Sequence, residues 1–259
     1  MPGVNEQRTF IGVAALCFIA SAAVTIAWCA SMSMPGMEMP GGWTMSMAWM
    51  RMPGQGWPGA AASFIGMWAV MMIAMMLPAL VPMLLRYRAA LGRAPASRRN
   101  ALTLRVAAGY FLLWILAGVT AYPPGVVLAE LAMRVPAVTH AMPIAAGIAT
   151  MLAGAWQLSR WKLRQLEGCR DTIDCCRPPG ATATAAWRHG FDLGARCLRC
   201  CGPLTALLFV MGVMELRAMA LVTGAIAIER GASRGNRAAR AFGAVMLAAG
   251  LLGVLRALE

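Results

Sequence analysis

The chain has 259 residues, of which 60% are hydrophobic and only 13% are charged, and its formal net charge is +13. That apolar fraction exceeds the usual range of soluble domains, and the charges fall in blocks between apolar runs near the ~20-residue length of a spanning helix. Arginines placed between such runs serve orientation in a membrane, which argues against a soluble nucleic-acid-binding protein. We expect an all-α, polytopic helical membrane protein with about five to six transmembrane helices, with allowance for one broken or re-entrant helix.

The first apolar run, residues 10–31, is longer than the core of a usual signal peptide, so we interpret it as an uncleaved helix. Cys17 and Cys29 lie within it and are interpreted as packing residues. We expect residues 1–58 to comprise this helix and an external Met-rich loop. Residues 59–259 are expected to form the helical membrane domain, with a cytoplasmic Cys-rich loop at 160–201.

The Met-rich loop, residues 32–57, is dominated by methionine, proline and glycine, and the last two make a stable helix unfavourable. Its methionines form four Met-x-Met pairs: Met32, Met34, Met37, Met39, Met45, Met47, Met50 and Met52. In an extended chain residues i and i+2 point the same way, so each pair presents two thioethers on one side. Thioethers are soft ligands that suit Cu(I). The alternative interpretation is a membrane-surface loop that uses Met and Trp as apolar anchors, and both stay open.

The second apolar run, residues 59–85, contains a row of methionines at helical spacing. Met67, Met71 and Met75 recur every four residues and therefore share one face of a helix. Adaptable core packing is the favoured interpretation of this row, and Met71 and Met75 are kept as candidate metal ligands. Six arginines between residues 86 and 105 then form a basic loop, which is typical of the cytoplasmic side.

Four further apolar runs are expected to span the membrane or re-enter it: residues 106–133, 141–159, 203–228 and 238–257. The first of them contains Pro123-Pro124-Gly125, and we expect the helix to be broken there. Glu215 and Arg217 interrupt the third, so each needs a partner or a break in the helix. Arg230, Arg234, Arg237 and Arg240 follow this run. If the spans simply alternate, these arginines lie on the external side, whereas a re-entrant hairpin would place them on the cytoplasmic side, and the sequence supports both topologies.

Six of the eight cysteines lie in two clusters: Cys169, Cys175 and Cys176, then Cys197, Cys200 and Cys201. Proline is favoured in the first turn of a helix, so we predict that a helix starts near Pro203. The second cluster would then stand at a helix N-terminus beside two arginines, where thiolates are favoured. Two clusters roughly twenty residues apart, one of them containing CxxC, are typical of a zinc or copper thiolate site. The alternative is that these cysteines are inert small apolar residues.

Several motifs resemble those of a bacterial family of predicted metal-binding integral membrane proteins, the domain of unknown function 2182. They are Trp68-x-x-Met71-Met72-x-Ala74-Met75-Met76-Leu77-Pro78, His189-Gly190, Cys176-Arg177-x-Pro179, and Cys197-Leu-x-Cys200-Cys201 followed by Leu208-Phe209 and Gly212-Val213-Met214. The resemblance runs from about residue 59 to residue 255. It implies metal binding by the cysteines and no established activity.

We interpret the chain as a multi-pass protein of the bacterial inner membrane that binds a soft metal. Copper(I) is the expected metal, to be handled, sensed or transferred, and zinc is the second candidate. The expected thiolate site comprises Cys176, Cys197, Cys200 and Cys201, with Cys169, Cys175 and His189 as additions. The expected partners are the lipid bilayer, the metal ion and other membrane proteins, with no nucleic acid.

Two other functions stay open. One is a membrane thiol–disulfide oxidoreductase that uses Cys197 and Cys200, and the other is a membrane assembly protein with a structural zinc site. The chain shows no Ser/His/Asp arrangement, phosphate loop or paired carboxylates, so we do not expect an enzyme of the hydrolase or transferase type.

Overall fold

The computed structural model describes residues 4–31, 37–40, 43–51, 54–92, 94–170, 182–231 and 235–258. The helices are α1 Val4–Ser31, α2 Trp57–Ala90, α3 Ala96–Arg134, α4 Pro136–Leu158, α5 Arg160–Arg170, α6 Ala183–Met211, α7 Leu216–Gly231 and α8 Gly235–Leu258. By length and composition, six of these described helices could cross a membrane: α1, α2, α3, α4, α6 and α8. The predicted all-α class is confirmed.

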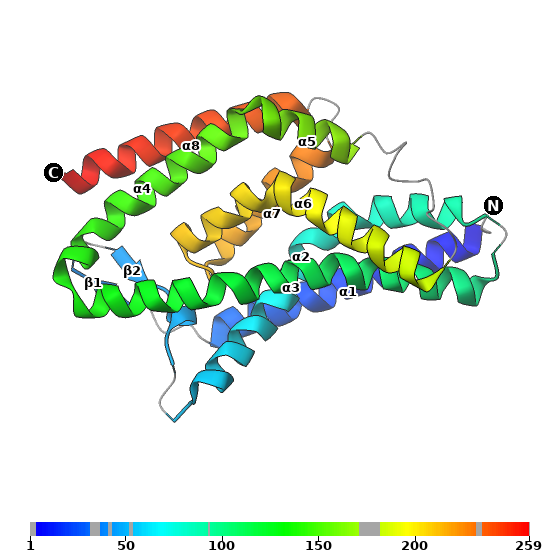
Figure 1. Ribbon diagram of the computed structural model, residues 1–259, viewed down its shortest axis with the longest axis horizontal. Coiled ribbons are helices and arrows are strands. Elements are labelled where there is room, and N and C mark those ends of the chain that lie inside the picture. Colours follow the sequence, from blue (N-terminus) through cyan, green and yellow to red (C-terminus); the bar gives the residue numbers. More distant parts are fainter. Residues whose placement is uncertain are drawn as a thin grey trace.

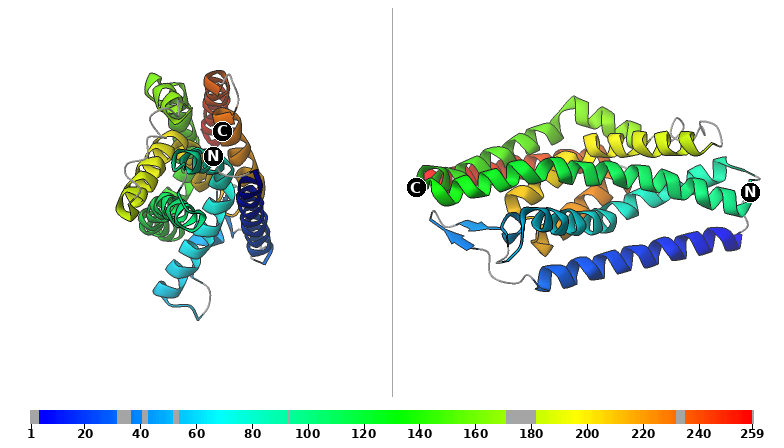
Figure 2. Two further views of the ribbon diagram at one scale, coloured as in Figure 1. Left: turned by 90° about the vertical axis from the view of Figure 1, so that its right-hand side faces the viewer. Right: turned by 60° about the horizontal axis from the view of Figure 1, so that its bottom comes forward.

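Long helices lie side by side along one common direction, with the two chain termini at opposite ends (Figure 1). Helices α2, α3, α6 and α7 enclose the main buried core. Helix α1 lies on the outside against α2, and only 6% of its most apolar window is buried (Figure 2). An apolar helix exposed to this extent matches a surface that meets lipid rather than water.

The pair of α4 and α8 is held together by glycines. A Cβ atom on Gly154 would lie 2.9 Å from the carbonyl oxygen of Gly243, and one on Gly250 would lie 2.7 Å from the carbonyl oxygen of Gly147. The two antiparallel helices therefore touch backbone to backbone, as small residues permit in membrane helix pairs.

The described part of the Met-rich loop begins with a small hairpin of two extended segments. Strand β1 (Met37–Met39) pairs antiparallel with β2 (Trp43–Met45), and a short 3-10 helix η1 (Met47–Trp49) follows. The Ser46 side chain accepts a hydrogen bond from the Ala48 amide and caps this 3-10 helix. The Trp49 ring packs against Phe64, Tyr122 and Phe209, which fixes the segment on the bundle.

The predicted helix start near Pro203 is wrong. Helix α6 begins at Ala183, where the side chain of Thr182 accepts a hydrogen bond from the Ala185 amide, and it continues through Pro203. A proline inside a helix removes one backbone hydrogen bond, and neighbouring helices in a bundle compensate for that loss. The second cysteine cluster therefore lies inside a helix, so the proposed effect of a helix N-terminus on its thiols does not apply. Most described residues of the predicted loop at 160–201 are helical.

The predicted break at Pro123-Pro124-Gly125 is also wrong, because α3 runs through all three residues. Gly125 serves the packing of the loop: a Cβ atom there would lie 2.2 Å from a ring carbon of Trp49. The proline pair thus falls where the helix is covered by a docked segment rather than where it ends.

A true break separates α6 from α7. Gly212 has φ 107°, a value that favours glycine, and the Glu215 carboxylate accepts a 3.0 Å hydrogen bond from the Ala218 amide at the start of α7. The interruption expected around Glu215 and Arg217 is therefore a turn. Helix α7 then runs back alongside α6 (Figure 1). This hairpin brings the end of α7 to the same end of the bundle as the end of α2.

Candidate metal centre

Three cysteines of α6 are buried in the core: Cys197, Cys200 and Cys201. Residues four apart share one face of a helix, and the Sγ atoms of Cys197 and Cys201 lie 3.8 Å apart. The two thiols are therefore in hydrogen-bond contact inside the core. The other described cysteines with placed side chains, Cys17 and Cys29, lie on α1.

Side chains from two other helices contact the Cys197 thiol, and a third helix is connected to it through Arg230. The Tyr110 hydroxyl of α3 donates to Cys197 Sγ at 2.9 Å, and Arg230 Nη1 of α7 donates to the same sulfur at 3.3 Å. Arg230 Nη2 also lies 3.3 Å from Sδ of Met83 on α2. We call Met83, Tyr110, Cys197, Cys201 and Arg230 the thiol cluster. It joins three sulfur atoms, one hydroxyl and one guanidinium from four helices.

Close contact between α3 and α6 makes this arrangement attainable. A Cβ atom on Gly190 would lie 2.3 Å from the carbonyl oxygen of Val106, and one on Gly194 would lie 3.1 Å from that of Tyr110. The missing side chains let the two backbones approach, so the Tyr110 ring reaches Cys197 one turn further along α6.

A buried ion pair lies behind the thiol cluster. Lys162 Nζ of α5 is 2.9 Å from Glu229 Oε2 of α7, and their side chains are 0% and 1% exposed. Gln157 Nε2 donates to the other carboxylate oxygen at 2.5 Å, and Lys162 also donates to the backbone carbonyl of Cys200. These contacts fix α5 and α7 against the cysteine-bearing turn of α6. Glu229 directly precedes Arg230, so the same contacts hold the register in which Arg230 faces the sulfurs.

The ion pair also has a defined electrostatic character. Burial raises the pKa of the Glu229 carboxyl above its ordinary value, against the opposing effect of the Lys162 charge. For Lys162, burial lowers the pKa, but negative charge on Cys200 and Glu229 outweighs that effect and leaves the pKa raised. The lysine is therefore charged at neutral pH, and it is the group that makes a buried carboxylate tolerable there.

The methionine row of α2 is buried along its length. Met67, Met71 and Met75 are 2%, 0% and 4% exposed. A cavity of about 420 Å³ lies between α2 and α7, and its lining includes Met75, Met83 and Arg230. The methionine row thus ends at a cavity that borders the thiol cluster.

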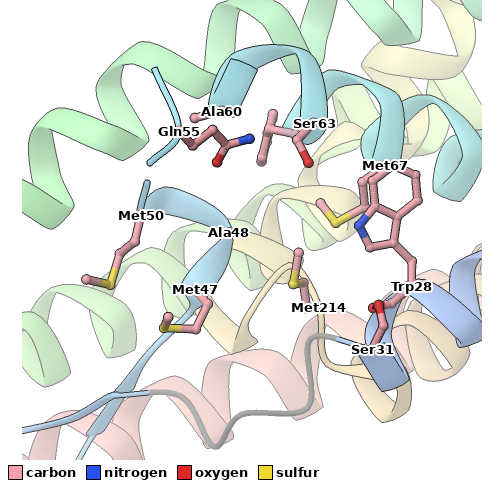
Figure 3. A pocket seen from close by; sticks show the side chains of 11 residues that line it. Trp28, Ser31, Met47, Ala48, Met50, Gln55, Ala60, Ser63, Met67 and Met214 are labelled. Atoms are coloured by element: carbon pink, nitrogen blue, oxygen red, sulfur yellow. The ribbon is translucent and has the colours of Figure 1, made fainter. Parts of the chain in front are cut away.

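A second, smaller cavity of about 100 Å³ lies at the opposite end of the row and is lined by four methionines. Met47 and Met50 come from the Met-rich loop, Met67 from α2 and Met214 from the turn before α7. In Figure 3 the thioether of Met67 extends from α2 toward that of Met214 on the other side of the cavity. Met67 is therefore shared by the row and the cavity, and Met71 lies between the two cavities along α2.

The remaining candidate ligands are dispersed. Met39 and Met45 pack with Ala129 and Ala132 in a small apolar cluster, whereas Met37 is exposed. The His189 ring stacks on Tyr87 at 5.4 Å between centroids rather than facing the thiols. Cys169 belongs to the last turn of α5, and the structure describes its backbone but not its side chain. Five further candidates lie outside the described residues: Met32, Met34, Met52, Cys175 and Cys176.

Among the described residues, no three side chains of His, Cys, Asp or Glu are placed to share one metal ion. Convergence of Cys176 and Cys200 with the Cys197–Cys201 pair on one metal ion therefore stays a prediction. The Cys201 thiol is also hydrogen-bonded to the Cys200 thiol, and the Arg230 guanidinium connects the sulfur of Met83 to the cluster as a further soft atom.

Met83, Tyr110 and Arg230 were missed by the sequence analysis. Met83 continues the four-residue spacing of the methionine row after Ala79, which is a usable signal. Tyr110 and Arg230 carry no local signal, because they lie 87 and 33 residues from Cys197 in the chain.

Six helices able to cross a membrane, with a buried sulfur cluster between them, define a polytopic helical protein with a candidate soft-metal centre. The chain belongs to the PpoB2 copper chaperone family, whose model matches residues 65–253. No curated protein and no solved structure matches the chain. The expected resemblance to a metal-binding membrane family is thereby confirmed at the level of a copper-related family. The matched range contains the whole thiol cluster, whereas the hairpin of the Met-rich loop precedes it.

Proposed function

We propose that this protein is a membrane copper chaperone that carries Cu(I) on the Cys197–Cys201 pair. The observation that supports it most directly is the 3.8 Å separation of two buried Sγ atoms in a chain of a copper chaperone family. Thiolate and thioether sulfurs are the protein ligands that select Cu(I). The family description names copper and not zinc, which favours the first of the two candidate metals.

The methionines supply a route to this pair. The thioether cavity at Met47, Met50, Met67 and Met214 would take up Cu(I), and the buried row on α2 leads toward the cavity beside the thiol cluster. Thioethers are neutral and compete with no proton, whereas a thiol must lose its proton to bind. The ion would therefore move from weaker neutral ligands to tighter charged ones.

Burial of the thiols favours small cargo over exchange with a protein disulfide. Cys200 and Cys201 are fully buried and Cys197 is 1% exposed. Thiol–disulfide exchange requires direct attack of one sulfur on another, so a protein substrate would have to reach the core of the bundle. A single metal ion has no such requirement.

The test is a titration of the purified full chain with Cu(I) against a competing chelator. Cys197→Ser combined with Cys201→Ser should remove one equivalent of tightly held Cu(I). The matched control is Cys17→Ser, which removes an exposed thiol on α1 and should leave the stoichiometry unchanged. Full stoichiometry in the double variant would show that the pair does not carry the metal.

A further inference from the structure

Arg230 occupies the space that a metal ion would need. Its two terminal nitrogens lie 3.3 Å from two sulfurs on different helices, Cys197 Sγ and Met83 Sδ. Sulfur is a weak hydrogen-bond acceptor but a strong ligand for a soft metal. The two sulfurs that accept hydrogen bonds from the guanidinium are therefore better suited to bind a soft metal than to accept these hydrogen bonds.

The spacing of the two thiols leaves room for a third ligand. With metal–sulfur distances of ~2.3 Å, a value typical of thiolate sites, a 3.8 Å separation gives an S–metal–S angle of roughly 110°. An angle so far from 180° leaves one side of the ion open. Met83 reaches the cluster from α2 through the guanidinium, so its thioether is placed to complete a three-sulfur site with Cys197 and Cys201.

A copper ion that bridges Cys197 and Met83 would need the place of the Arg230 guanidinium, which contacts both sulfurs. The Tyr110 hydrogen bond to Cys197 can persist in the loaded site, because a metal-bound thiolate keeps further lone pairs. Cu(I) replaces the protons of the Cys197 and Cys201 thiols, which pass to solvent, so the loaded site holds one positive ion and two thiolates beside the displaced guanidinium and gains no net positive charge. The exchange is therefore less costly than addition of a cation to an already paired site.

The structure also provides a place for the displaced side chain. Arg230 lies on the wall of the 420 Å³ cavity, with Gly224 and Gly231 on its own helix and Arg86 on α2. A rotation of the arginine side chain into this cavity would clear the sulfurs without movement of the helix. The same rotation would open the passage between the cavity and the thiols.

We propose that Cys197, Cys201 and Met83 form a three-sulfur Cu(I) site, and that Arg230 is a displaceable cation that fills it between cargoes. This inference rests on the proposed function. In the apo protein the guanidinium contacts the sulfurs of Cys197 and Met83, while the Cys197 and Cys201 thiols share a hydrogen bond. On loading, Cu(I) takes its position, and on release the guanidinium returns and competes for the ligands.

The first test measures Cu(I) affinity in the full-length protein by chelator competition. Arg230→Gln removes the competitor, so Cu(I) should be held roughly tenfold more tightly, as expected for the loss of one charged hydrogen-bonded contact. The control is Arg86→Gln, which removes a charge from the same cavity without contact to a sulfur and should leave the affinity unchanged. Equal affinities in the two variants would overturn the role of Arg230.

Arg230→Lys serves if the glutamine variant does not fold. It keeps the charge, but one ammonium cannot contact both sulfurs as the two guanidinium nitrogens do. Its Cu(I) affinity should lie above that of the wild type, with Arg86→Lys as its control. Affinity at or below the wild-type value would count against displacement.

The second test counts sulfur ligands by X-ray absorption of the copper-loaded protein. The wild type should show three sulfurs around copper and Met83→Leu should show two, because leucine keeps the volume of methionine without its sulfur. Three sulfurs in Met83→Leu would exclude Met83 as a ligand. Loss of one equivalent of copper in Cys197→Ser with Cys201→Ser, together with no effect at Met83 or Arg230, would retain the proposed function and reject this site.

Discussion

The Tyr110 hydroxyl of α3 donates a 2.9 Å hydrogen bond to Sγ of Cys197 on α6, and both side chains are buried. This contact orients the thiol toward Cys201 and connects the two helices that pack most closely around the cluster. A hydrogen-bond donor to a metal-binding sulfur changes the affinity of that sulfur for the metal, as hydrogen-bond partners of other metal ligands do.

Removal of that hydroxyl should weaken copper binding without loss of the ligands. For Tyr110→Phe we expect about tenfold weaker Cu(I) binding, at the lower end of the effect of outer partners on metal affinity. Chelator competition on the purified protein measures it. Tyr122→Phe is the control, because Tyr122 packs on Trp49 away from the thiols. Equal affinities in both variants would show that the hydroxyl does not influence the site.

The thioether cavity should bind soft monovalent metal independently of the thiols. Met67→Leu combined with Met214→Leu removes two of its four sulfurs at nearly constant volume, so the fold should persist while one equivalent of Ag(I) or Cu(I) is lost. Met133→Leu, at an exposed position of α3, is the control. Binding at this cavity should change little with pH, whereas binding at the thiol pair should weaken as pH falls. Unchanged stoichiometry in the double variant would leave the cavity as apolar packing.

Loss of Lys162 should strongly destabilise the protein. Lys162→Met leaves Glu229 buried without its partner, at an expected cost of about 3–5 kcal/mol in unfolding free energy. The double variant Lys162→Met with Glu229→Met should recover most of that loss, because neither charge remains. Thermal unfolding in detergent compares the three proteins. A double variant as unstable as the single one would argue against a purely electrostatic cause.

The Lys162→Met variant should also gain stability as pH falls. Burial raises the folded-state pKa of Glu229 above its unfolded value, and loss of the lysine removes the largest opposing effect. A raised folded pKa means that the folded state binds the proton more tightly than the unfolded state does. The stabilisation is therefore complete below the unfolded pKa and is lost as pH rises through the folded pKa. A pH series of unfolding midpoints checks the sign, with the double variant as the reference.

Close packing of α4 on α8 should make Gly154 intolerant of a side chain. Its Cβ would lie 2.9 Å from the carbonyl oxygen of Gly243, so Gly154→Ala should cost roughly 1–3 kcal/mol through overpacking. Gly253→Ala is the matched control, because the nearest atom to its Cβ is 3.8 Å away. Equal thermal stability of the two variants would mean that the helix pair separates easily.

The orientation of the bundle can be tested at its two ends. We expect the hairpin outside and the arginine-rich end of α3 in the cytoplasm, because positive charge is retained on that side. An impermeant maleimide should label Met37→Cys but not Ser97→Cys in intact cells, on a Cys17→Ser background; all three positions are exposed. The native cysteines of α6 are buried and cannot report the side. Labelling of position 97 alone would invert the orientation.

Local sequence patterns were sufficient for the elements whose formation depends on their own residues. Apolar runs of spanning length correctly predicted α1, α2, α3, α4 and α8, because backbone groups in such runs are satisfied within the helix itself. The same holds for the methionine row, since Met67 and Met71 share a face in any regular helix. The extended conformation at Met37–Met39 follows from the prolines and glycines nearby.

Tertiary structure decided what the prolines do and which groups meet at the thiols. Pro203 and Pro124 carry the same local signal that ends helices elsewhere, but packed neighbours let α6 and α3 continue through them. The thiol cluster joins Met83 to Arg230 across 147 residues, a contact that no local pattern contains. It forms because Gly194 lets α3 approach α6, and because the turn at Gly212 sends α7 back beside α2. The sequence by itself therefore determined most of the helices and where soft ligands are concentrated, whereas only tertiary packing decided that α6 continues through Pro203 and which ligands share a site.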